Sequence, residues 1–134
     1  MLEYASYCGN YYGSPKKSAL EMLEQGKDVI LEIEVQGALQ VKKSFPDAMF
    51  IFILPPSVKE LRRRLEKRGT ETEEKINKRV AQAENEIKQA AHYDYVMING
   101  DLDEAVNELK SIICAEKCTI KRAENKIYEV LKNA

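Results

Sequence analysis

The chain has 134 residues, of which 21 are Lys or Arg, 22 are Asp or Glu and 44% are hydrophobic. This length supports one domain with one modest core, and the balanced charge argues against a chain-wide basic surface for nucleic acid. No apolar stretch approaches the roughly 20 residues that span a bilayer, and the first residues lack the pattern of a signal peptide. The three cysteines are expected to be reduced thiols. We therefore expect a cytoplasmic protein without nucleic-acid or membrane partners.

The first 26 residues predict short strands followed by a helix. Four of the seven tyrosines lie among the first twelve residues, close to glycines, and this composition is typical of strands joined by turns. The sequence from Ser14 to Gly26 then predicts a helix, because it opens with an N-cap residue and a proline and closes with a glycine.

A strand is predicted next, from Asp28 to Val35, where apolar and polar residues alternate. The apolar residues share one face of this strand, whereas Glu32 and Glu34 share the other face near its carboxyl end.

The remainder of the chain predicts alternating strands and helices. Residues 49–54 are apolar at every position, which is typical of a strand covered on both faces in a parallel sheet. The expected elements are a helix over 37–45, a strand over 49–54, helices over 58–68 and 73–91, a strand over 93–99, and helices over 102–116 and 120–131. This alternation predicts an α/β fold with a parallel sheet and right-handed crossovers.

Glu32 and Glu34 lie where a parallel sheet binds its ligand, beyond the carboxyl ends of its strands. Two carboxylates on one strand face can hold hydrated Mg²⁺ or accept hydrogen bonds from a base or a hydroxyl. The alternative is a solvated sheet face with two ordinary surface acids.

Arg64, Arg68 and Arg79 form a second candidate site. Arg64 and Arg68 are four residues apart on one helix and hence on one face, and Arg79 follows on the next helix. Guanidinium groups from two helices can form a fork for phosphate oxygens. The alternatives are charged surface helices laced with Glu–Arg pairs, or a helical surface over 57–91 that binds RNA or a partner.

The tyrosine-rich opening, with Glu3 and Ser14, offers hydrogen-bonding groups for a polar heterocycle, although buried aromatic packing is an equal alternative. His92 is the only histidine, which excludes a His-rich metal site. Cys114 and Cys118 have no second pair nearby, so a zinc site is not expected.

Four segments together resemble guanylate kinase: GNYYGS, LEIEVQGALQV, PPSVKELRRRLEKRGTETEEKINKRV and DYVMIN. They match that family in order and spacing from residue 1 to about residue 116. The resemblance implies a transferase of purine nucleotide metabolism that converts ATP and GMP to ADP and GDP. It also implies an incomplete parallel sheet of the P-loop-kinase type with flanking helices, a helical lid and a remnant of the GMP-binding β region.

The resemblance assigns roles on the GMP side of such a site. Glu3 and Ser14 correspond to residues that bind guanine, and Tyr12 corresponds to a tyrosine that hydrogen-bonds the GMP phosphate. Glu34 reaches the guanine side, and Glu32, counted among the catalytic residues, faces the region of Mg²⁺ and phosphate.

The resemblance also assigns roles on the ATP side. Arg64, Arg68 and Arg79 correspond to the catalytic arginines of the lid, which clamp donor phosphates and neutralise the transferring group. Asn99 lies near the adenine. The implied cofactor is Mg²⁺ with ATP, without a direct protein ligand beyond contact with Glu32 through water.

The family pattern divides the chain into five parts. These are a GMP-binding remnant (1–14), a first core part (15–58), the lid and following helix (59–91), a second core part (92–116) and a C-terminal helical extension (117–134). The extension lies outside the resemblance.

Two family features are missing from the 134 residues. No segment reads G-x-x-x-x-G-K-[ST], the loop that holds the donor phosphates. The family also has a pair of arginines before the segment that corresponds to residues 2–4 (LEY), and this pair is absent here. We therefore expect a C-terminal portion that is inactive alone. The missing P-loop strand would leave sheet edges without partners, which offers a route to self-association. The alternative function is a non-catalytic guanylate-kinase-like module that binds a peptide or protein.

Overall fold

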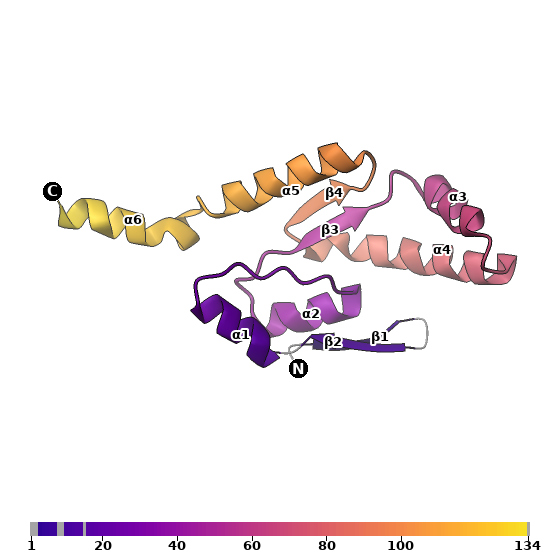
Figure 1. Ribbon diagram of the computed structural model, residues 1–134, viewed down its shortest axis with the longest axis horizontal. Coiled ribbons are helices and arrows are strands. Elements are labelled where there is room, and N and C mark those ends of the chain that lie inside the picture. Colours follow the sequence, from indigo (N-terminus) through magenta and orange to yellow (C-terminus); the bar gives the residue numbers. More distant parts are fainter. Residues whose placement is uncertain (1–2, 8–9, 15, 134) are drawn as a thin grey trace. The chain divides into compact units, whose positions relative to one another are not determined.

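The computed structural model describes the backbone of residues 3–7, 10–14 and 16–133, and the side chains of residues 17–133. The chain divides into two compact units, Met1–Phe50 and Ile51–Ala134, which are described separately (Figure 1).

The first unit contains a β-hairpin and two helices. Strands β1 (Glu3–Tyr7) and β2 (Asn10–Ser14) pair antiparallel, as the tyrosine- and glycine-rich opening predicted. Helices α1 (Lys16–Glu24) and α2 (Val35–Ser44) follow, and α2 contacts β1. Among the side chains of this unit that the structure describes, the buried apolar ones are Ala38, Val41 and Phe50.

The strand predicted from Asp28 to Val35 is wrong, because residues 27–34 adopt neither helix nor strand. The side-chain pattern that suggested it is still present: Ile30 is 71% exposed, whereas Val29 and Leu31 are partly buried. A strand also needs a neighbour for its backbone N–H and C=O groups. The neighbour expected here was the P-loop strand, which the 134 residues do not contain.

The second unit is built on two parallel strands. Strand β3 (Ile51–Leu54) pairs with β4 (Tyr95–Ile98), with Ile51 opposite Tyr95 and Leu54 opposite Ile98. The helical elements of this unit are α3 (Val58–Arg68), α4 (Glu73–Ile87), the 3₁₀ helix η1 (Lys88–His92), α5 (Leu102–Glu116) and α6 (Ile120–Lys132). Strand–helix alternation and the ends of α3, α5 and α6 agree closely with the sequence prediction.

Each face of the β3–β4 sheet is buried only in part. Phe52 and Met97 are 8% and 5% exposed, and the ring of Phe52 meets that of Tyr93 edge-on with centroids 5.0 Å apart. The register places Phe52 opposite Val96 and Ile53 opposite Met97, and partners of a strand pair share a face. Each face therefore carries one buried residue beside one that is more than half exposed, since Ile53 is 58% and Val96 57% exposed. The prediction that residues 49–54 are covered on both faces is wrong at Ile53, because the face that it shares with Met97 is covered only in part.

Local signals define the ends of α3 and α4. The Ser57 hydroxyl accepts a hydrogen bond from the Glu60 backbone N–H at 2.9 Å, and Thr72 caps α4 in the same way through Lys75 at 3.3 Å. Gly69 ends α3 in the left-handed conformation, with φ of 64°.

The two helices pack together as a hairpin (Figure 1). Leu65 on α3 and Ile76 and Val80 on α4 form a buried cluster, with Val58 and Leu61 packed against it. We refer to residues 58–87 as the α3–α4 hairpin.

Glu116 joins the sheet to the last two helices. Its carboxylate accepts hydrogen bonds from the Tyr95 hydroxyl at 2.9 Å and from Arg122 Nε at 3.1 Å. These bonds, that from Arg122 above all, lower the pKa of Glu116, and the bond to Glu116 raises the pKa of Tyr95. Thr119 caps α6 by accepting from the Arg122 backbone N–H.

None of the described helices is long and apolar enough to cross a membrane.

Candidate functional site

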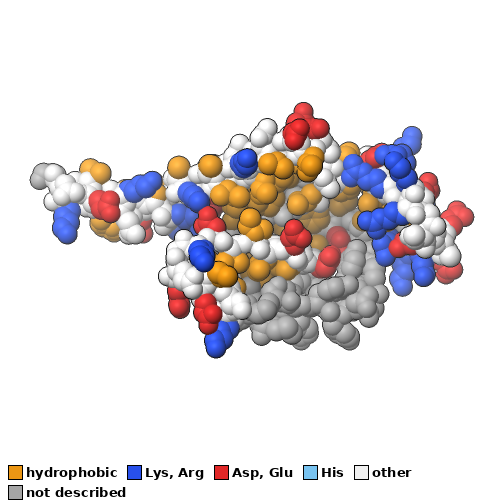
Figure 2. Space-filling model, in the orientation of Figure 1, with side chains coloured by type: hydrophobic (Ala, Val, Ile, Leu, Met, Phe, Trp, Pro, Cys, Tyr) orange, Lys and Arg blue, Asp and Glu red, His pale blue; other side chains and the backbone are white. Residues whose placement is uncertain are grey.

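Basic side chains are concentrated on α3, which carries six Lys or Arg residues and two Glu residues in eleven positions. Figure 2 shows these cations, interspersed with acidic side chains, over α3 and α4 at the right of the molecule. The hairpin core fixes the backbone of this region, so the positions of its arginines depend on side-chain contacts.

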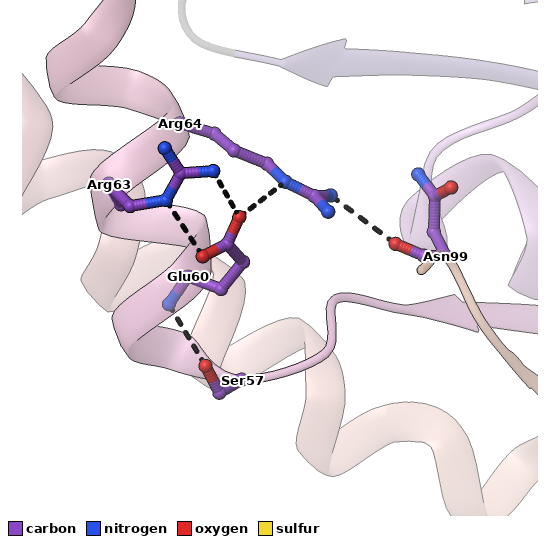
Figure 3. A network of polar contacts seen from close by, with 5 residues as sticks. All are labelled: Ser57, Glu60, Arg63, Arg64 and Asn99. Atoms are coloured by element: carbon purple, nitrogen blue, oxygen red, sulfur yellow. Dashed lines mark hydrogen bonds and ion pairs between the residues drawn. The ribbon is translucent and has the colours of Figure 1, made fainter. Parts of the chain in front are cut away.

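Glu60 is the centre of a network of polar contacts on α3 (Figure 3). Arg63 donates two hydrogen bonds to this carboxylate, from Nε to Oε2 at 2.9 Å and from Nη2 to Oε1 at 2.7 Å. Arg64 adds a third hydrogen bond, from Nε to Oε1 at 3.2 Å. One carboxylate thus serves two guanidinium groups, and the three side chains together carry one net positive charge.

Arg64 also reaches across to the end of the sheet. Its Nη1 donates to the backbone carbonyl oxygen of Asn99 at 3.3 Å (Figure 3). The Asn99 backbone is itself fixed, because its N–H donates to the carbonyl of Leu54 at 2.7 Å. Among the described residues, no partner engages Nη2 of Arg64, so its two N–H donors and the second N–H of Nη1 are left for a ligand.

The Glu60 carboxylate is strongly held in its charged form. Hydrogen bonding from Arg63, aided by the charge of Arg63 and by Arg64, lowers the pKa of Glu60 from 4.5 to about 2. The same contact raises the pKa of Arg63. The Glu60 carboxylate is therefore ionised over the whole physiological pH range.

Arg79 on α4 has a carboxylate partner of its own. Its Nη2 lies 2.7 Å from Glu71 Oε1, and the Glu71 side chain is only 15% exposed. The other carboxylate oxygen, Oε2, is buried without a hydrogen-bond partner among the described residues. An unpaired buried acceptor costs free energy on the order of 1–3 kcal/mol, so Glu71 is held in place at a cost.

The structure brings some of the predicted ATP-side residues together. Arg64 and Asn99 are in direct contact although 35 positions separate them in the sequence. Arg64 and Arg79 are held by different carboxylates. Arg68 lies exposed in the last turn of α3.

Three residues of this region were not among the predicted site residues: Glu60, Arg63 and Glu71. The spacing of Glu60 with Arg63 and Arg64, three and four positions apart, is the usual signal for ion pairs on a helix. That signal supported the alternative of Glu–Arg pairing along surface helices, and these pairs are present beside the candidate phosphate-binding arginines.

Glu32 and Glu34 do not share a strand face, because their segment is irregular. Glu32 is exposed, and Glu34 lies partly buried directly before α2, where its side chain makes no capping hydrogen bond. Among the described residues, no three His, Cys, Asp or Glu side chains could jointly hold a metal ion.

The predicted guanine-binding residues fall on the β1–β2 hairpin. Its register places the backbone of Glu3 directly opposite that of Ser14, and Ala5 opposite Tyr12. The side chains of Glu3, Tyr12 and Ser14 lie outside the described residues.

The chain is similar to guanylate kinases over most of its length. The guanylate kinase family model matches residues 1–116. The guanylate kinase of Desulfitobacterium hafniense is 53% identical over 122 residues, which cover 91% of this chain and 61% of that protein. That of Halalkalibacterium halodurans is 49% identical over 132 residues, which cover 98% and 65% respectively.

A crystal structure of guanylate kinase from Anaplasma phagocytophilum shares the fold, with a TM-score of 0.75 and 33% identity over 90% of this chain and 58% of that chain. The fold is accordingly α/β and corresponds to part of a P-loop kinase. The chain thus spans about 60% of the length of the relatives that it matches.

The similarity also extends further along the chain than the sequence motifs indicated. The family model ends at residue 116, as expected, but the match to the H. halodurans protein covers 132 residues and so runs through most of α6. The family model thus agrees with the predicted limit of the resemblance, whereas this one relative matches the chain beyond it.

Proposed function

This chain belongs to the guanylate kinase family, and we propose that it supplies the lid, the adenine end of the sheet and part of the GMP site of an enzyme that transfers a phosphoryl group from ATP to GMP. The observation that carries the proposal is Arg64, whose guanidinium is anchored beside the end of β4 with three N–H donors left for phosphate. Phosphoryl transfer depends chiefly on such positioned positive charge, because the transition state carries its charge on phosphate oxygens.

The arginines of the α3–α4 hairpin act on the donor side in this proposal. Arg64, Arg68 and Arg79 bind donor phosphates and neutralise the transferring group, and Asn99 contacts the adenine end of ATP. The hairpin comprises most of the predicted lid, residues 59–91. Arg64 joins that lid to the residue that follows β4.

The GMP side of the proposal rests on the first unit. Glu3, Ser14 and Glu34 would select guanine through hydrogen bonds from its N1–H and N2–H groups, and Tyr12 would bind the GMP phosphate. The pairing of Glu3 with Ser14 in the β1–β2 register supports a shared role for these two residues.

Mg²⁺ would enter with ATP in this proposal. The exposed Glu32 carboxylate suits contact through water, and Mg²⁺ usually retains several waters beside the substrate phosphates. A cytoplasmic location remains a prediction from the cysteine content.

The 134 residues taken alone are predicted to turn over negligibly, because they contain no G-x-x-x-x-G-K-[ST] sequence to hold the donor phosphates. An ADP-release assay with purified chain, ATP, Mg²⁺ and GMP measures this directly. Turnover comparable with that of a complete guanylate kinase would contradict the prediction.

Calorimetric titration with GMP, with AMP as the matched control nucleotide, tests the proposed specificity. We expect weak heat from GMP and none from AMP, since AMP lacks the N1–H and N2–H donors. Glu34→Gln should reduce the GMP signal, because a neutral amide accepts hydrogen bonds less strongly than a carboxylate. Equal responses to both nucleotides, or none to GMP, would count against the proposal, and the latter would favour a peptide-binding module.

A further inference from the structure

The Glu60 carboxylate is fixed by Arg63 before it meets Arg64. The Arg63 fork occupies both of its oxygens, at 2.9 and 2.7 Å. The Ser57 hydroxyl accepts from the backbone N–H of Glu60 and contacts neither carboxylate oxygen. A carboxylate restrained in this way can restrain another side chain in turn.

Arg64 is anchored at two points of its guanidinium plane. Nε contacts Glu60 and Nη1 contacts the Asn99 carbonyl, so the plane is held between α3 and the end of β4 (Figure 3). Nη2 has no partner among the described residues. The Arg64 side chain is 40% exposed and would sample many rotamers without these two contacts. The contacts thus select one orientation of Arg64.

We propose that Glu60 is a positioning residue, held by Arg63, which orients Arg64 so that Nη2 faces the donor phosphates. This inference rests on the proposed function, in which Arg64 binds the phosphates of ATP. It assigns to a carboxylate, a group that repels phosphate, the task of improving phosphate binding.

A Glu60 that competed with phosphate for Arg64 would change phosphate binding in the opposite direction from a Glu60 that positions Arg64. If Glu60 only competed with phosphate for Arg64, its neutralisation would strengthen phosphate binding, and so would the accompanying gain of positive charge. If Glu60 positions Arg64, its neutralisation weakens binding in spite of that gain. The sign of the change therefore separates the two roles.

The experiment measures binding of inorganic tripolyphosphate to the 134-residue chain by calorimetry at constant ionic strength. Glu60→Gln should weaken binding roughly three- to tenfold, because Arg64 must then be ordered at the expense of binding free energy. Arg64→Gln should weaken it more, and Arg63→Gln should weaken it in the same direction as Glu60→Gln. Gln retains the helix propensity of Glu, so α3 is expected to form in Glu60→Gln.

Ser57→Ala is the matched control for a purely structural effect. It removes the cap of α3 but neither guanidinium contact, and should leave the tripolyphosphate affinity unchanged. The ¹⁵N–¹H signal of Arg64 Nε adds a spectroscopic test. It should respond to tripolyphosphate in the unmodified chain and lose its distinct position in Glu60→Gln, while the α3 amide signals persist.

The affinities of these variants for tripolyphosphate separate the positioning role of Glu60 from the phosphate-binding role of Arg64. Tighter or unchanged binding in Glu60→Gln, with weaker binding in Arg64→Gln, would overturn the positioning role and leave the proposed function standing. Equal losses in Glu60→Gln and Ser57→Ala would reduce Glu60 to a structural residue. Tripolyphosphate binding that is absent from the unmodified chain, or indifferent to Arg64→Gln, would overturn the phosphate role of Arg64 and the inference with it.

Discussion

Glu60 receives three hydrogen bonds from two guanidinium groups, and this concentration of positive charge dominates its chemistry. Its carboxylate belongs to a helix surface where most ion pairs contribute little to stability. In our proposal the main contribution of Glu60 is to orient the guanidinium of Arg64, not to stabilise the fold. Neutral pH is far above the pKa of about 2 that these contacts produce.

The lowered pKa of Glu60 gives a pH dependence of definite sign. The folded pKa lies below the usual value of 4.5, so the stabilisation is complete above about 4.5 and is lost as the pH falls through about 2. We expect the carboxyl ¹³C signal of Glu60 to titrate with a midpoint near 2. In Arg63→Gln the midpoint should move up toward 4.5, because Arg63 is the largest cause of the shift. A midpoint near 4.5 in the unmodified chain would show that the network does not form in solution.

Residue types on α3 could be recognised from the sequence, but their contacts could not. The spacing of Arg64 and Arg68 predicted a phosphate-binding face, and the family pattern assigned Asn99 to the adenine. The contact between Arg64 and the Asn99 carbonyl depends on how α3 leaves the sheet, which no local pattern specifies. Likewise, the helical spacing of Glu60 indicates ion pairs but not which of two arginines dominates.

At the level of secondary structure, local signals predicted the helices well and the strands less well. Ser57 and Gly69 bracket α3 at the expected ends, since caps and left-handed glycines act through neighbouring backbone groups. A strand depends on a partner elsewhere in the chain. Residues 28–35 have the alternation of a strand without a partner, and residues 51–54 pair with β4 while apolar side chains stay exposed on both faces of the sheet.

Gly69 is expected to be sensitive to the addition of a side chain. Its φ of 64° is unfavourable for L residues, so Gly69→Ala should cost about 1–2 kcal/mol of unfolding free energy through the backbone alone. Apart from Gly69 and its chain neighbours, no described residue lies within 4 Å of the added Cβ. Gly100→Ala is the matched control, since its Cβ would make an ordinary 3.9 Å contact with Ile98. Urea denaturation of both variants measures the difference, and equal stability would contradict the prediction.

The core of the α3–α4 hairpin should tolerate truncation poorly. Leu65 is 9% exposed and packs on Ile76 and Val80, so Leu65→Ala is expected to cost about 2–3 kcal/mol. Lys67→Ala, on the exposed side of the same helix, should change stability little. Hydrogen exchange of α3 and α4 amides reports the loss. Similar protection in both variants would show that this cluster does not hold the hairpin.

For the whole molecule, the most consequential feature is a small sheet with exposed apolar residues on both of its faces. Ile53, Val96 and Ile98 are each more than half exposed, which is unusual for parallel strands. Exposed apolar faces and strand edges favour association between chains. The corresponding proteins are longer, and this chain spans about 60% of their length.

Self-association through this sheet is therefore expected, with sedimentation velocity showing a mass that rises with protein concentration. Ile53→Thr together with Val96→Thr should shift the equilibrium toward monomer, because Thr keeps strand propensity while reducing apolar area. Met22→Thr is a suitable control, since Met22 is an exposed apolar residue outside the sheet. An unchanged distribution in the double variant would place the association elsewhere or exclude it.

The parallel pairing of β3 with β4 also has a consequence for the order of folding. The α3–α4 hairpin lies between these strands in the sequence, so it forms the crossover connection that a parallel pair requires. Its contacts are local, whereas the strands must close a long loop, and such closure becomes more costly in entropy with length. A hairpin that forms early shortens the loop left to close. The segment that carries the arginines proposed to bind phosphate is thus also expected to bring the two strands together during folding.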